Sequence, residues 1–264
     1  SVLCTNESVL IVTEQAATAL LRHLKQAGAY LLAPDERDRV AAMLFPGGRF
    51  DIRFVGKDAS WIAAEAGLRV PNRTRVLLAP FDLVVPEEPL AHEKLCPVLG
   101  LVRVPTARRG IDAARAVLRL SGRGHSAAIH STDPQVIMEY GAAVEVLRVA
   151  VNVGNSLGSA GLETNLAPTM TIGTGFFGRS SVGENLHPSH LVQWTRLAYN
   201  RDPAEPFGDF AGLTPWQAPA DRNGHQGTVP PYPVASNQRG DHPATASGGG
   251  QANSPARSEL NGSD

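Results

Sequence analysis

Two cysteines, Cys4 and Cys96, are the strongest potential nucleophiles in this chain of 264 residues. A thiol becomes reactive when nearby cations or backbone amides lower its pKa from the usual value of about 8.5. Cys4 lies in the polar stretch "CTNES", directly before an apolar run, so we expect it in an exposed loop at a sheet edge. Cys96 lies in the apolar context "LCPV" and is expected to be a small packing residue, since most free cysteines are buried and inert. The local pattern leaves Cys4 open between a nucleophile and an inert thiol.

Three further side chains could support chemistry at a nucleophile. His125 follows a glycine turn and precedes an expected strand, and such junctions between loop and strand often carry site histidines. His130 alternates with it on the same strand and is the weaker candidate. Glu93 precedes another expected strand, where a surface carboxylate is the simpler interpretation. The spacing of the His, Cys, Asp and Glu residues does not resemble a zinc site, so we predict no metal.

The stretch "GTGFFG" at 173–178 matches the glycine pattern of dinucleotide-binding turns. In such a turn a strand precedes the glycines and a helix follows them, with the pyrophosphate at the helix N-terminus. Here the polar sequence "RSSVGENLHPSH" follows, without an apolar helical face. We therefore interpret 173–178 as a tight loop, which could line an active site without holding a pyrophosphate.

Strands and helices alternate along most of the chain. Short apolar runs predict strands, and apolar residues with helical spacing, preceded by capping residues such as Thr13, Asp35 and Asp58, predict helices. The strands are expected at 8–13, 75–81, 96–104, 126–131, 147–153 and 191–200, and the helices at 14–29, 34–48, 57–67, 108–120 and 133–143. This order predicts an α/β fold with a mostly parallel sheet flanked by helices.

The composition changes after residue 202. Residues 203–264 are rich in Pro, Gly, Ser, Asn and Gln and contain few aliphatic side chains. Such a segment buries too little apolar surface to offset the entropy of ordering it, so we expect a disordered tail. The predicted domains are therefore a catalytic or oligomerisation part at 1–202 and a tail at 203–264.

Charge and hydropathy exclude several classes of partner. The formal net charge is −1 and no basic cluster is present, which argues against nucleic acid and anionic membranes as partners. The longest apolar runs are too short to span a membrane, and two cysteines fit a reducing compartment such as the cytoplasm.

Six segments in order resemble the aldehyde dehydrogenase superfamily, and most closely its coenzyme A-acylating branch. They are "LCTNESVLIV", "VGKDASWIAAEAGLRVP", "EKLCPVLGLVRV", "GHSAAIH", "APTMTIGTGFFGRSS" and "HLVQWTRLAYN". This branch includes bacterial microcompartment enzymes and the aldehyde half of bifunctional alcohol/aldehyde dehydrogenases. The resemblance covers roughly residues 1–202.

The resemblance assigns a role to each candidate. It implies that Cys4 is the nucleophile, that Glu93 holds the nicotinamide ribose, and that His125 lies in the active site. The implied reaction converts a short aldehyde, NAD or NADP, and coenzyme A into an acyl-CoA through a thioester on Cys4. The nucleotide-binding half that precedes the nucleophile in this superfamily is not in the sequence. We therefore expect a C-terminal part of a longer enzyme, which by itself neither binds NAD tightly nor turns over and is inactive as a dehydrogenase.

Other interpretations stay open. A hydrolytic aldehyde dehydrogenase would use water in place of coenzyme A, and a truncated fold could serve as a non-catalytic assembly module. The resemblance also implies a homo-oligomer, and location inside a microcompartment shell is an additional possibility.

Overall fold

A computed structural model describes residues 3–205, 208–209 and 211. The chain divides into a unit of residues 1–195 and a unit of residues 196–264, and every helix and strand of the described residues lies in the first. Most of the predicted tail lies outside the described residues, so its disorder and its boundary at residue 203 stay predictions.

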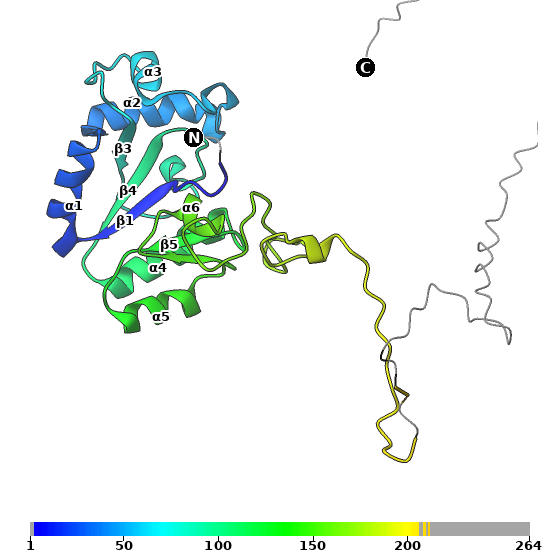
Figure 1. Ribbon diagram of the computed structural model, residues 1–264. Coiled ribbons are helices and arrows are strands. Elements are labelled where there is room, and N and C mark those ends of the chain that lie inside the picture. Colours follow the sequence, from blue (N-terminus) through cyan, green and yellow to red (C-terminus); the bar gives the residue numbers. More distant parts are fainter. Residues whose placement is uncertain (1–2, 206–207, 210, 212–264) are drawn as a thin grey trace, which may run out of the picture. The chain divides into compact units, whose positions relative to one another are not determined.

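Two parallel sheets form the centre of the first unit (Figure 1). The larger sheet has the order β1-β4-β3-β2, with all neighbours parallel. The smaller sheet pairs β5 with β6, also in parallel. The strands are β1 (Val9–Thr13), β2 (Ala29–Leu31), β3 (Val76–Pro80), β4 (Val98–Val104), β5 (Ala127–Ile129) and β6 (Val149–Val151). The predicted parallel α/β fold is thus confirmed.

Helices connect the parallel strands and cover the sheets. They are α1 (Glu14–Gln26), α2 (Pro34–Leu44), α3 (Ala59–Glu65), α4 (Ala107–Leu120), α5 (Pro134–Ala143) and α6 (Asn155–Ser159). Thr13 and Asp58 occupy the expected N-cap positions. The prediction of Asp35 as a cap is wrong, because Ala33 is the N-cap of α2 and Pro34 opens the helix. Proline suits this position because the first helical N–H has no partner within the helix.

The main hydrophobic core lies between the larger sheet and helices α2 and α3. Alternate residues of β4, Val98, Val102 and Val104, enter this core, whereas Leu101 packs with α1 on the opposite face. A third cluster joins α4, α5 and the smaller sheet. The segment before β4 packs closely against Gly100. A Cβ at this residue would lie only 2.7 Å from the Leu90 carbonyl oxygen. The loop that carries Glu93 therefore begins in close contact with β4.

The structure differs from the predicted elements in three places. Strand β2 and helix α6 are short and were not predicted. Residues 191–200 contain no strand, so that prediction is wrong. The apolar side chains of Leu191, Trp194 and Leu197 are instead 75%, 66% and 72% exposed. Alternation alone does not make a strand, because a strand also needs a partner for its backbone hydrogen bonds.

Within the described residues, no helix has the length and apolar character needed to cross a membrane.

Candidate functional site

Cys4 lies in a tight turn before β1. The Asn6 N–H donates to the Leu3 carbonyl at 3.0 Å, which places Cys4 and Thr5 at the corner of the turn. The Cys4 thiol is exposed, as the local sequence predicts for a loop. It borders a mostly apolar hollow, whose other lining residues are Leu3, Thr5, Ala160, Thr169, Met170 and Ile172. A small apolar group could thus approach the sulfur from this side.

Helix α6 is joined to this turn by side-chain and backbone hydrogen bonds. The Thr5 carbonyl accepts hydrogen bonds from Asn155 Nδ2 at 2.9 Å and from Ser156 Oγ at 3.2 Å. Ser156 Oγ also lies 3.2 Å from Asn6 Oδ1, and the Asn155 N–H donates to the Glu7 carboxylate at 2.8 Å. These contacts join segments that lie about 150 residues apart in the chain.

His125 is connected to the same helix. Its Nδ1 lies 2.9 Å from Ser126 Oγ, and Asn155 Nδ2 donates to that hydroxyl at 2.9 Å. Burial and the positive charge of Arg148 lower the pKa of His125, while the negative charge of Glu93 opposes them. The environment therefore favours the neutral imidazole.

Arg148 is a buried cation behind His125. Its guanidinium donates to the His125 carbonyl at 3.2 Å, the Gly173 carbonyl at 2.8 Å and Asn185 Oδ1 at 2.5 Å. Burial lowers the pKa of Arg148. These bonds attach the glycine-rich loop to the strand that follows His125.

The "GTGFFG" segment at 173–178 is a series of turns, and no helix follows it before residue 188. Gly124 has φ of 79°, and a Cβ at that residue would overlap the Thr174 carbonyl. The loop thus packs directly against the residue before His125. This is the arrangement expected of a loop near a site, and it lacks the helix that a pyrophosphate-binding turn requires.

Glu93 is exposed at the end of the loop that precedes β4. The next residue, Lys94, is only 4% exposed, and its Nζ donates to the carbonyls of Leu90 and His92, each at 2.7 Å. Burial lowers the pKa of Lys94 to about 7. Lys94 therefore anchors the loop from inside and leaves the neighbouring carboxylate of Glu93 in solvent.

The remaining candidates do not contribute to this site. Cys96 is buried in the main core, as expected for a packing residue, and burial raises the pKa of its thiol. His130 is exposed at the end of the smaller sheet. No group of three or more His, Cys, Asp or Glu residues within the described part of the chain could hold a metal ion.

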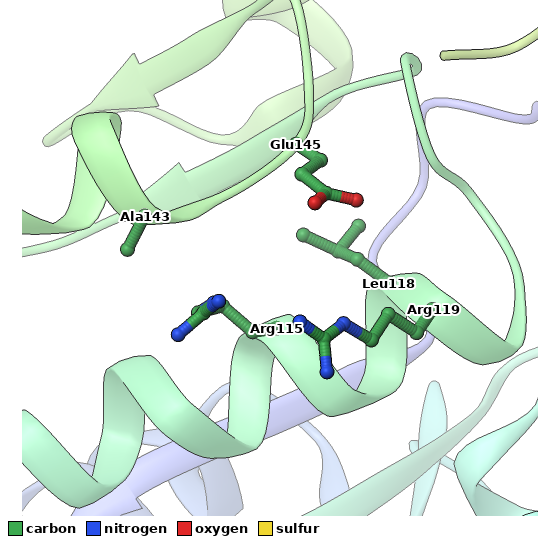
Figure 2. A pocket seen from close by; sticks show the side chains of 5 residues that line it. All are labelled: Arg115, Leu118, Arg119, Ala143 and Glu145. Carbon is green, nitrogen blue, oxygen red and sulfur yellow. The ribbon is translucent and has the colours of Figure 1, made fainter.

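A separate hollow lies between α4 and the end of α5 (Figure 2). Arg115 and Arg119 line it on the α4 side, and Glu145 lines it on the other side. Glu145 also pairs with Arg123 at 2.6 Å. The hollow is too narrow for a substrate-sized molecule and contains none of the candidate residues.

Sequence reasoning missed four residues that organise the site: Lys94, Ser126, Arg148 and Asn155. The sequence did not reveal the structural roles of Lys94 and Arg148, because charged residues are usually exposed and are not expected inside a fold. Asn155 follows strand β6 in the polar stretch "GNS". Polar residues at the carboxyl end of a parallel strand often face a site, which was the available signal.

Comparisons with known proteins agree on one group of enzymes, although no family model matches the chain. Over 206 residues the chain is 32% identical to an aldehyde-alcohol dehydrogenase of Clostridium acetobutylicum, a match covering 76% of this chain and 24% of that protein. An acetylating aldehyde dehydrogenase from Geobacillus thermoglucosidasius superposes with a TM-score of 0.73 at 30% identity, covering 79% of this chain and 45% of that one. A propionaldehyde dehydrogenase from Rhodopseudomonas palustris, solved with bound CoA and an acylated cysteine, gives 0.58 at 26% identity, covering 67% and 40%. The chain spans less than half the length of each of these proteins.

Proposed function

We propose that this chain, a homologue of the acylating aldehyde dehydrogenases, carries the nucleophilic cysteine for the conversion of a short aldehyde to an acyl-CoA. The observation that carries the proposal is the exposed Cys4 thiol at the corner of a turn, linked through α6 to a half-buried histidine. A reactive thiol must be accessible and held in place, and Cys4 meets both conditions.

The proposed reaction has two half-reactions at Cys4. The thiolate adds to the aldehyde carbon and forms a thiohemiacetal. Loss of hydride from that carbon leaves a thioester on Cys4. The thiol of coenzyme A then attacks the thioester carbonyl, the Cys4 thiolate leaves, and acyl-CoA is released. The equilibrium constant for exchange between a thioester and another thiol is close to one, because the bond formed resembles the bond broken.

NAD or NADP would supply the hydride acceptor when bound. The exposed carboxylate of Glu93 fits the role of accepting hydrogen bonds from ribose hydroxyls, because a carboxylate has only acceptor oxygens. The negative charge of Glu93 also acts on His125. It raises the pKa of the imidazole, whereas burial and the charge of Arg148 lower it.

We propose that His125 assists the chemistry at the Cys4 thiol or the thiol of coenzyme A, by a proton transfer or by a hydrogen bond to the sulfur. An imidazole can do so near neutral pH, and the lowered pKa of His125 keeps it uncharged and able to take part. The apolar hollow beside Cys4 suits an aldehyde with a short aliphatic chain. The homo-oligomer and the association with a shell stay predictions.

Acyl transfer in reverse tests the cysteine without any nicotinamide. The full chain is incubated with propionyl-CoA and analysed by intact-protein and peptide mass spectrometry. We expect a gain of one propionyl group on Cys4, which disappears in Cys4→Ser and persists in Cys96→Ala. A folded protein that gains no propionyl group, or gains it equally on other residues, contradicts the proposal. That outcome would favour a non-catalytic assembly module.

A further inference from the structure

Asn155 connects the Cys4 turn to His125 through hydrogen bonds to Thr5 and Ser126. The side chain is only 4% exposed and belongs to the first turn of α6. Its Nδ2 donates to the Thr5 carbonyl and to Ser126 Oγ, both at 2.9 Å. Its Oδ1 accepts from Ser159 Oγ at 2.9 Å. A buried amide with all these partners is held in a single orientation.

The types of the partners determine which way the amide faces. A carbonyl oxygen can only accept, so the atom that faces Thr5 must be the donating nitrogen. An NH₂ group has two hydrogens, and here one is given to Thr5 and the other to Ser126. Ser126 Oγ therefore accepts from Asn155.

The hydroxyl hydrogen of Ser126 is then available for His125. The Nδ1 of His125 lies 2.9 Å from Ser126 Oγ. If Ser126 donates along this contact, Nδ1 is the accepting nitrogen, and the neutral imidazole carries its hydrogen on Nε2. The chain of hydrogen bonds thus runs from Asn155 through Ser126 to His125.

We propose that Asn155 is a positioning residue that couples the Cys4 turn to His125 and fixes the neutral imidazole as its Nε2–H tautomer. The inference deepens the proposed acyl transfer and rests on it for its functional meaning. In this tautomer the neutral imidazole of His125 can donate a hydrogen bond from Nε2 to a thiolate, such as the sulfur that leaves Cys4. A base acting through Nε2 would need the opposite tautomer, with the hydrogen on Nδ1.

Nuclear magnetic resonance of the full chain tests both halves of the proposal without requiring turnover. Labelling the eight histidines with ¹⁵N and recording long-range ¹H–¹⁵N spectra above the His125 pKa reports the tautomer. His125→Gln identifies the signals of this residue. Exchange of the Asn6 amide hydrogen with solvent reports the stability of the Cys4 turn, because this N–H closes the turn.

Three variants separate the two connections. Asn155→Ala should shift the His125 ring nitrogens toward a mixture of tautomers and speed Asn6 exchange about fivefold, as expected for one lost hydrogen bond. Ser126→Ala should change the tautomer only. Ser156→Ala, which loses a bond to Thr5 but not to Ser126, should speed Asn6 exchange only.

Two results would overturn the proposal. One is a wild-type spectrum in which Nδ1 carries the hydrogen, and the other is a folded Asn155→Ala protein that leaves either signal unchanged. If Asn155→Ala does not fold, Ser126→Ala and Ser156→Ala decide the question, and each must change its own signal alone. Failure of propionyl transfer to Cys4 would leave these measurements unaffected, so the two proposals fail independently.

Discussion

Replacing the buried Lys94 tests the electrostatics of the loop that carries Glu93. Burial lowers the pKa of Lys94 from 10.5 to about 7. As the pH rises, the folded state therefore loses the Lys94 proton at a much lower pH than the unfolded state does. Between these pH values the unfolded state binds more protons, and the free energy of unfolding must rise with pH. At about 1.36 kcal/mol per pKa unit, the whole rise is about 5 kcal/mol. Two hydrogen bonds to carbonyls favour the charged ammonium, so this value is an upper limit.

The assay is urea denaturation, followed by circular dichroism, at several pH values from 7 to 10. We expect the free energy of unfolding of the wild type to rise with pH relative to that of Lys94→Met. Groups other than Lys94 titrate in both proteins and cancel in the difference. Lys25→Met, which removes an exposed lysine from α1, is the control and should run parallel to the wild type. Parallel curves for wild type and Lys94→Met would refute the reasoning.

Two further predictions concern His125 and the loop behind it. A ¹H titration of the His125 ring should give a pKa below 6.5, raised by Arg148→Met and lowered further by Glu93→Gln, because the two charges act in opposite directions; equal values in all three proteins would contradict this. Gly124→Ala should lower the free energy of unfolding by at least about 2 kcal/mol, because a Cβ meets the Thr174 carbonyl and the backbone has positive φ. Gly141→Ala, in an open position of α5, should instead raise it by about 1 kcal/mol; similar thermal denaturation midpoints for the two variants would contradict the packing of the loop.

The elements that the sequence predicts well are those with a local cause. The helices of 107–120 and 134–143 follow from apolar residues at helical spacing, and the buried strands follow from apolar runs. The loop position of Cys4 follows from the polar residues around it, since they cannot continue a buried strand. The same local reasoning fails at 191–200, where alternation is present but no partner strand is formed.

The contacts that organise the candidate site have no local cause. Thr5 and Asn155 are separated by 150 residues, and only the folded chain brings the carbonyl of one to the amide of the other. Lys94 is buried although its residue type predicts exposure, because the turn before it presents two carbonyl oxygens at the right distance. Candidate residues can thus be recognised in the sequence by type, whereas the residues that position them depend on tertiary structure.

Both loops beside the candidate site are attached through a buried basic side chain that donates hydrogen bonds to oxygens of carbonyl or amide groups. Lys94 binds the loop of Glu93 through two carbonyls, and Arg148 binds the glycine-rich loop and the His125 backbone. A carboxylate partner would cancel the charge of Arg148, but carbonyl and amide oxygens leave it in place. Burial and the charge of Arg148 together lower the pKa of His125 and favour its neutral imidazole.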